Sequence, residues 1–147
     1  MSKLASSFFS KEEKQKILHA IAEAEKASSG EIRVHIDNKC AGEVLDCASH
    51  AFAKLKMHKT QLRNGVLFYL AVRSKKFAVL GDIGINQKVP ENFWDEIKVE
   101  MHKAFLKGDF VGGLSDGIIS AGLQLKQHFP YQTDDKNELS DEISFGK

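Results

Sequence analysis

The sequence predicts an α/β protein, specifically a three-layer α/β/α sandwich with a mixed sheet of three to five strands. Helix-like and strand-like segments alternate along the first 130 residues, and a helix separates the first two strands. This order favours a parallel pair with a right-handed crossover. A third strand follows after a turn so short that it must form an antiparallel hairpin with the second. Helices on both faces of such a sheet are the simplest way to bury its apolar side chains.

The first helix is predicted by a capping box at residues 10–13. Ser10 and Glu13 can each accept a hydrogen bond from the other's backbone amide. Four apolar side chains then follow at helical spacing, namely Ile17, Leu18, Ile21 and Ala24. We expect this helix to end before Gly30.

The first strand is predicted at residues 31–36, where apolar and polar side chains alternate strictly. Glu31, Arg33 and His35 therefore share one face of the strand. We interpret this face as the solvated side of an edge strand. A polar surface for a ligand or partner is the alternative.

The middle of the chain predicts a helix at residues 42–56, a basic loop, and a hairpin of strands at residues 65–72 and 77–81. The first hairpin strand is apolar without alternation, which indicates a central strand covered on both faces. If the turn centres on Ser74 and Lys75, then Leu67 lies opposite Asp82, and Gly65 lies near Gly84. The basic run is interpreted as a solvated helix end and loop rather than an anion site, because it lacks interleaved aromatic side chains. It consists of Lys54, Lys56, His58, Lys59 and Arg63.

Two further helices are predicted before residue 130. The first covers residues 91–106 and places Trp94 on its buried stripe, and the second begins after Asp109, a good N-cap. The second helix carries four glycines, Gly112, Gly113, Gly117 and Gly122. Glycine disfavours helix, so this many in one helix indicates unusually close packing against a neighbour.

The overall composition is that of an ordinary globular domain. The chain has 147 residues, with 21 Lys and Arg against 20 Asp and Glu. A nearly balanced charge gives no reason to expect binding to nucleic acid. No apolar run is long enough to span a membrane. The N-terminus lacks the apolar core of a signal peptide. We therefore expect a cytoplasmic protein, monomeric and made of one domain.

Two segments bear on the compartment and on the domain boundary. Cys40 and Cys47 would lie about 10 Å apart along one helix, too far for a disulfide, so we expect reduced thiols. Residues 131–147 hold five acids and few apolar side chains. This composition predicts a disordered acidic tail after a domain at residues 1–130.

The hairpin geometry also indicates a candidate site. Asn64, Gly65, Gly81 and Gly84 meet at one sheet edge and could bind a phosphate group through exposed backbone amides. Asp82, together with Asp109 if it faces that edge, could hold a hard divalent cation such as calcium or magnesium. Ordinary turn chemistry is the alternative, since glycine, asparagine and aspartate also supply turns and caps.

Five short motifs, in this order and at this spacing, resemble the TPM domain family over residues 8–130. They are Ser10-Lys11-Glu12-Glu13, Ser29-Gly30-Glu31-Ile32-Arg33-Val34, Asn64-Gly65-Val66-Leu67, Gly81-Asp82-Ile83-Gly84 and Lys107-Gly108-Asp109-Phe110-Val111-Gly112-Gly113-Leu114. The family includes many bacterial proteins and thylakoid-lumen photosystem-repair proteins, and from this resemblance we expect a bacterial protein. It also implies an α/β/α fold, phosphatase activity and, in some members, divalent-cation binding. The sequence departs from the family where Arg63 replaces an acidic residue before Asn64.

Two functions follow. The resemblance implies a phosphatase acting on a phosphorylated small molecule, with a divalent cation as an optional aid rather than a required cofactor. The residues themselves fit a non-enzymatic interaction module for a membrane-associated or soluble protein partner at least as well. No nucleophile and base pair can be named from the sequence, and Arg63 could replace the cation by pairing with Asp82.

Overall fold

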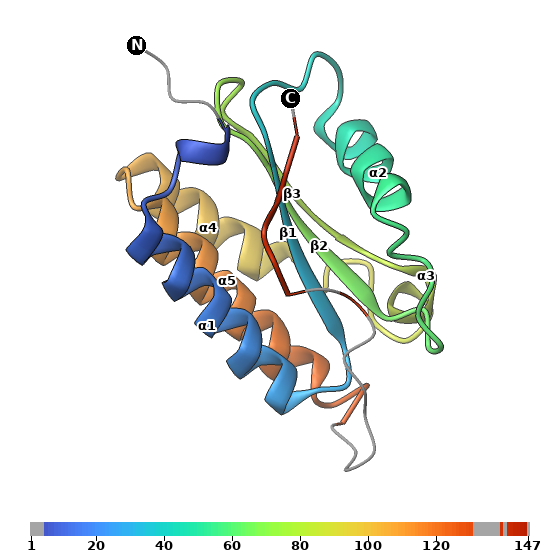
Figure 1. Cartoon of the computed structure of the whole chain (residues 1–147). Helices are drawn as coiled ribbons and strands as arrows, with labels where there is room; N and C mark the ends of the chain where they lie inside the picture. The colour runs from blue at the N-terminus through green and yellow to red at the C-terminus, as the bar shows by residue number, and fades with distance from the viewer. Residues whose placement is uncertain (1–4, 131–138, 140, 147) are drawn as a thin grey trace.

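The computed structural model of the chain describes residues 5–130, 139 and 141–146. It is a three-layer α/β/α arrangement around a four-stranded mixed sheet, as expected (Figure 1). The elements are η1 (Ala5–Ser7), α1 (Lys11–Ala27), β1 (Glu31–Asp37), α2 (Val44–Lys54), β2 (Gly65–Ala71), β3 (Lys76–Gly81), α3 (Ile83–Asn86), α4 (Asp95–Leu106), α5 (Phe110–Leu125) and β4 (Ser144–Phe145).

The sheet has the strand order β3-β2-β1-β4. Strands β1 and β2 are parallel and β2 and β3 antiparallel, which confirms the predicted crossover and hairpin. Every residue of β2 is buried, as its apolar run predicted. Strand β1 is not an edge strand, because β4 pairs with its other side in parallel.

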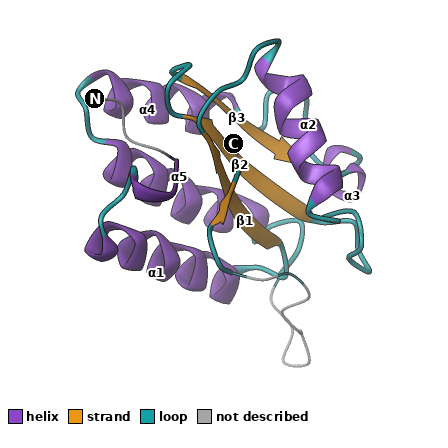
Figure 2. Ribbon diagram, turned by 45° about the horizontal axis from the view of Figure 1, so that its top comes forward, coloured by secondary structure: helices purple, strands orange, loops and turns teal. Residues whose placement is uncertain are grey.

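Helices α1, α5 and α4 cover one face of the sheet, and α2 lies on the other (Figures 1 and 2). The larger core lies under the three helices, and Trp94 belongs to it with only 8% of its surface exposed. The glycines of α5 serve close packing. A Cβ at Gly122 would lie 2.7 Å from the Cα of Ala24 on α1, and one at Gly117 would lie 2.8 Å from the Sδ of Met101 on α4.

The predicted hairpin register is wrong by two residues. Leu67 lies opposite Leu80 rather than Asp82, and Val66 lies opposite Gly81. The turn spans residues 72–75, where Lys75 adopts a positive φ of 55°. Because side chains alternate with period two, this shift leaves every side chain on its predicted face.

Two helix boundaries are also later than predicted. Helix α2 begins at Val44 rather than at residue 42, and α4 begins at Asp95 rather than at residue 91. Between Pro90 and Trp94 the chain forms turns instead.

The late start of α2 overturns the expectation of two free thiols. Cys40 lies in the loop before α2 and Cys47 lies on the helix, so the loop turns back on the helix. The two Cα atoms are 6.1 Å apart and the sulfurs form a disulfide. Disulfides persist in oxidising compartments, so the cysteines no longer support the expectation of a cytoplasmic location.

The described part of the acidic tail is not disordered. Ser144 and Phe145 form β4, and the amide of Gly146 donates to the carbonyl of Ile36 at 2.8 Å. Ile143 and Phe145 pack against the larger core. In this stretch the prediction from composition is wrong, because the alternating residues 143–145 pair with the free edge of β1 and bury apolar side chains there. Residues 131–138, 140 and 147, to which the same prediction applies, lie outside the described residues.

Candidate functional site

At the predicted site edge, Arg63 and Asp82 form a bidentate ion pair. The Arg63 Nε and Nη2 donate to the two Asp82 carboxylate oxygens at 2.8 and 2.9 Å. Asp82 is only 6% exposed and also caps α3 by accepting from the amide of Ile83 at 2.7 Å. The arginine thus holds the carboxylate at the place where a cation was predicted.

Asn64 and the three glycines of this edge have structural roles. The Asn64 Nδ2 donates to the Ser29 carbonyl at 2.9 Å, and the Asn64 carbonyl accepts from the amide of Glu31. A Cβ at Gly84 would collide with the Leu62 carbonyl oxygen. Those at Gly65 and Gly81 would lie within 3.2 Å of the Met57 carbonyl and the Trp94 ring, respectively. The three glycines therefore allow neighbouring backbone and side-chain groups to pack directly against the chain at this edge.

Asp109 does not lie at this edge. It caps α5 at 2.9 Å from the Gly112 amide, whereas the other end of α5 contacts Gly30 through Leu125. The sixteen residues of α5 span about 24 Å. The prediction that Asp82 and Asp109 share one sheet edge is therefore wrong, and they cannot hold one ion between them.

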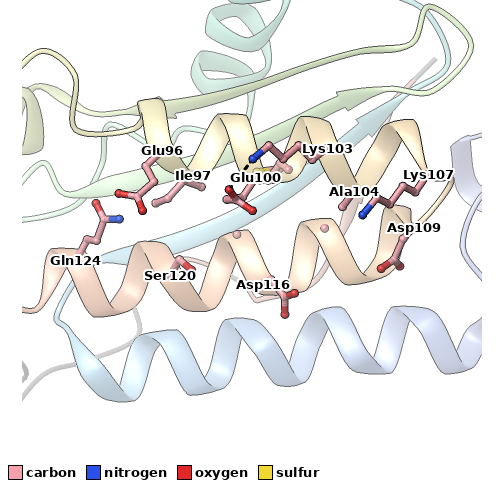
Figure 3. Close-up of a pocket in the computed structure, with 13 residues that line it drawn as sticks. Glu96, Ile97, Glu100, Lys103, Ala104, Lys107, Asp109, Asp116, Ser120 and Gln124 are labelled. Atoms are coloured by element: carbon pink, nitrogen blue, oxygen red, sulfur yellow. Dashed lines mark hydrogen bonds and ion pairs between the residues drawn. The ribbon is translucent and has the colours of Figure 1, made fainter.

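Asp109 instead lies at one end of an open groove of about 540 Å³ between α4 and α5 (Figure 3). The groove carries charges of both signs. Its Lys103 pairs with Glu100 at 3.4 Å, and its floor includes Gly113 and Gly117. This mixture of charges does not select a ligand of one sign.

A connected polar network lies at the other end of the sheet, where β1 and β2 finish. His35 Nδ1 lies 2.9 Å from Ser144 Oγ, and His35 Nε2 lies 2.8 Å from Asp37 Oδ1. The Tyr69 hydroxyl donates to the other Asp37 oxygen at 2.6 Å. A Cβ at Gly146 would collide with Asp37, so a glycine backbone closes over the His35–Asp37 hydrogen bond.

One arrangement of protons satisfies every hydrogen bond of the network when Asp37 is ionised and the His35 ring is neutral. An ionised Asp37 can only accept hydrogen bonds, so both the Tyr69 hydroxyl and His35 Nε2 must donate to it. In a neutral ring Nδ1 is then the acceptor, and the Ser144 hydroxyl donates to it. Burial, and then the hydrogen bond to Asp37, raises the pKa of Tyr69 above its usual range, which keeps this donor protonated. The arrangement is a hydroxyl, a base and a carboxylate that orients the base.

The network corrects the interpretation of Glu31, Arg33 and His35 as a solvated face. Glu31 and His35 are buried. Arg33 is half-buried, two residues before His35 on the same face, and its Nε is buried without a hydrogen-bond partner in the described part of the chain. The strict alternation of β1 had gathered these residues on one face. In the sequence, the alternation of Ile143, Ser144 and Phe145 is a signal for a strand that would place Ser144 beside His35. This segment was predicted to be disordered, so the serine was missed.

A carboxyl pair ties the tail to α1. Glu25 accepts from the amide of Ile32 at 3.1 Å and shares a hydrogen bond with Asp141. Burial, followed by that hydrogen bond, raises the pKa of Glu25 to about 9. A proton therefore holds the two carboxyl groups together near neutral pH.

Within residues 5–130, 139 and 141–146, no group of three or more His, Cys, Asp or Glu side chains is arranged to hold a metal ion. In the same residues, no helix combines the length and apolar character needed to cross a bilayer.

Comparisons with solved structures agree on the fold. The BA42 protein from the psychrophilic bacterium Bizionia argentinensis is 45% identical, with a TM-score of 0.91 over 99% of this chain and 100% of that chain. The N-terminal domain of the cg2496 protein from Corynebacterium glutamicum is 13% identical, with a TM-score of 0.64 over 97% of this chain and 82% of its own. An N-terminal domain from P. gingivalis is 15% identical, with a TM-score of 0.68 over 86% of this chain and 82% of its own.

No curated protein matches this chain. A sequence model described as the TPM domain matches residues 4–122, most of the chain. The match spans the capping box of α1, the Asn64-Gly65 and Gly81-Asp82 turns, and the glycine-rich start of α5. The chain therefore belongs to the TPM domain family.

Proposed function

We propose that this protein is a phosphomonoester hydrolase in which Ser144 is the nucleophile, His35 the general base and Asp37 the group that orients the base. The observation that carries the proposal is the hydrogen-bonded series from Ser144 Oγ through both ring nitrogens of His35 to Asp37. A nucleophile within hydrogen-bond reach of a base, itself oriented by a third group, is the arrangement that activates serine in many hydrolases.

The chemistry proceeds in two steps. In the first, Ser144 Oγ attacks phosphorus while its proton passes to His35 Nδ1. The bond from phosphorus to the ester oxygen breaks, and the departing oxygen takes the proton from His35. In the second step, His35 accepts a proton from a water molecule, whose oxygen attacks phosphorus. The bond from phosphorus to Ser144 Oγ breaks, inorganic phosphate leaves, and His35 returns the proton to Ser144 Oγ.

Arg33 is the residue suited to the phosphate charge. Its guanidinium has the planar set of donors that matches two phosphate oxygens. Its side chain shares the face of β1 with His35, and its Nε is buried without a partner in the described residues. The phosphatase activity implied by the TPM resemblance agrees with this assignment.

The proposal is tested with p-nitrophenyl phosphate as substrate. Ser144→Ala should lower kcat/KM by about 1,000-fold or more, the loss typical of a missing nucleophile. Ser49→Ala, which changes an exposed serine on α2, should leave the rate unchanged. Acid-quenched parent protein should carry one phosphate on Ser144. Equal rates for the parent and Ser144→Ala, or no turnover by the parent, would overturn the assignment.

Calcium or magnesium binding by Asp82 or Asp109 stays a prediction. Because the two carboxylates lie at different ends of the sheet, each would have to bind its own ion. A cation that competes with Arg63 for Asp82 should shift the amides of residues 63–65 and 81–85 in a magnesium titration. Asp82→Asn should abolish those shifts without unfolding the domain.

A protein-interaction role is the second candidate, because two apolar side chains lie exposed beside the Arg63–Asp82 pair. Leu62 and Ile83 are each 50% exposed, and their segments meet through the Gly84 amide, which donates to the Arg63 carbonyl at 2.9 Å. A photo-crosslinking residue at Ile83 should yield one discrete adduct in cells, which Leu62→Glu abolishes. The same probe at the exposed Leu123 is the control and should yield none.

A further inference from the structure

A second cleft, separate from the proposed hydrolytic residues, lies at the carboxyl end of β2. It has a volume of about 480 Å³, and its lining is dominated by Phe8, Leu70, Phe77, Phe105, Leu106 and Phe110. A volume of this size with mostly apolar walls is typical of small-molecule sites. Open α/β sheets also bind ligands beyond the carboxyl ends of their parallel strands.

The walls are held by contacts between aromatic rings from different elements. Phe77 on β3 meets Phe105 on α4 edge to face, with ring centroids 5.0 Å apart. Phe105 stacks on Phe110 of α5 at 5.4 Å, and Phe8 meets Phe110 at 5.2 Å. Leu106, at the end of α4, is 74% exposed beside them. The cleft is thus a preformed apolar surface that stays open to solvent.

The charged groups of the cleft all favour an anion. Its titratable lining residues are Lys75, Lys76 and His102, and no acidic side chain lines it in the described part of the chain. The Lys76 ammonium is turned away, because it donates to the carbonyl of Gly42 at 2.9 Å. The His102 ring stacks on the Phe77 ring with centroids 6.4 Å apart, and Lys75, in the turn between β2 and β3, also lines the cleft. Lys75 and His102 therefore form the polar rim of an aromatic cleft.

We propose that this cleft binds a medium-chain aliphatic carboxylate. The alkyl chain lies against the phenylalanine rings and Leu106, and the carboxylate is held at the rim by the Lys75 ammonium and the His102 ring N–H. The α4–α5 groove makes a useful contrast, since its mixed acids and lysines select neither an anion nor an apolar chain.

The test is a titration of the full chain with monomeric decanoate, followed through backbone amide shifts. The shifts should saturate and be confined to residues 70–77 and 102–110. Across hexanoate, octanoate and decanoate, affinity should rise about fourfold for each added methylene. Decyltrimethylammonium, which has the same chain and the opposite charge, should bind at least tenfold more weakly than decanoate.

Two variants separate the apolar and charged parts of the site. Leu106→Gln should weaken decanoate binding, whereas Leu123→Gln, at another exposed position, on α5, should not. Lys75→Gln should weaken decanoate binding about fivefold and leave decanol binding unchanged, whereas Lys59→Gln should change neither. Equal affinity for the cationic chain, shifts spread over the whole surface, or binding only to anionic phospholipid vesicles would overturn the proposal.

Discussion

The two ends of the parallel strands β1 and β2 use polar side chains differently. At the amino end, Arg63 and Asp82 pair with each other, and the nearby backbone groups are joined by hydrogen bonds. At the carboxyl end, Asp37, His35 and Tyr69 form a series that finishes on a serine hydroxyl. The first arrangement satisfies its own charges, and the second leaves a polarised hydroxyl at its end. An abundance of polar residues therefore does not by itself locate a site.

The largest change in stability is expected when the Arg63–Asp82 ion pair at the amino end is removed. Arg63→Met should lower the free energy of unfolding more than any other substitution at this edge, because it leaves the buried Asp82 carboxylate without its arginine partner. Arg73→Met, at an exposed arginine, should change it by less than about 0.5 kcal/mol. Urea unfolding measures both. The folded Arg63→Met variant should keep its phosphate-ester rate, since this edge is proposed to be structural.

The carboxyl pair Glu25–Asp141 should make the stability of the protein fall as pH rises. Burial and the hydrogen bond to Asp141 raise the pKa of Glu25 from 4.5 to about 9. Between these values the folded state binds more protons than the unfolded state, so the free energy of unfolding decreases with pH. The stabilisation is fully present below about pH 4.5 and is lost as pH rises through about 9.

Glu25→Gln removes this titration while keeping an acceptor for the Ile32 amide and a donor for Asp141. Urea midpoints measured from pH 5 to 9 should therefore fall less steeply in this variant than in the parent. Glu23→Gln, on the exposed side of α1, should keep the parental slope. Parallel slopes for the parent and Glu25→Gln would contradict the assignment of the shared proton to this pair.

At the carboxyl end of β1, the Cys40–Cys47 disulfide holds the loop that directly follows Asp37. Cys40 is also bound through its amide to Ser74 at 2.9 Å, so the loop has a second attachment. Cross-linking residues seven apart corresponds to about 2.5 kcal/mol on the chain-entropy estimate. The double variant Cys40→Ser/Cys47→Ser should melt about 5–10 °C lower than the parent. Reductant should lower the melting temperature of the parent by a similar amount and leave the double variant unaffected.

The sequence predicted the elements that follow from local periodicity and capping. The Ser10 capping box, the alternation of residues 31–36, the Asp109 cap and the burial of Trp94 all have local causes, and each is present in the structure. The pairing of Arg63 with Asp82 also followed from their positions at the hairpin edge. The disulfide did not, because its geometry depends on where α2 begins.

The proposed nucleophile could not be predicted for a related reason. Ser144 lies 109 residues from His35 along the chain, in a segment whose composition favours disorder. Its position comes from the open edge of β1, to which Ile143 and Phe145 contribute apolar contacts. Composition measures what a segment can bury by itself, and it does not include the surface that the rest of the fold provides.

The smallest expected effect comes from the Tyr69 hydroxyl, which lies at the far end of the network from Ser144. Tyr69→Phe should lower the free energy of unfolding by about 1 kcal/mol, the usual value for one hydrogen bond. If Asp37 orients His35, the phosphate-ester rate should fall only a few-fold, because the His35–Asp37 hydrogen bond is retained. Spectrophotometric titration should show a tyrosine ionising above the usual range in the parent, and this step should be missing in the variant. A loss of rate as large as that of Ser144→Ala would mean that the phenol, rather than Asp37, sets the position of the imidazole.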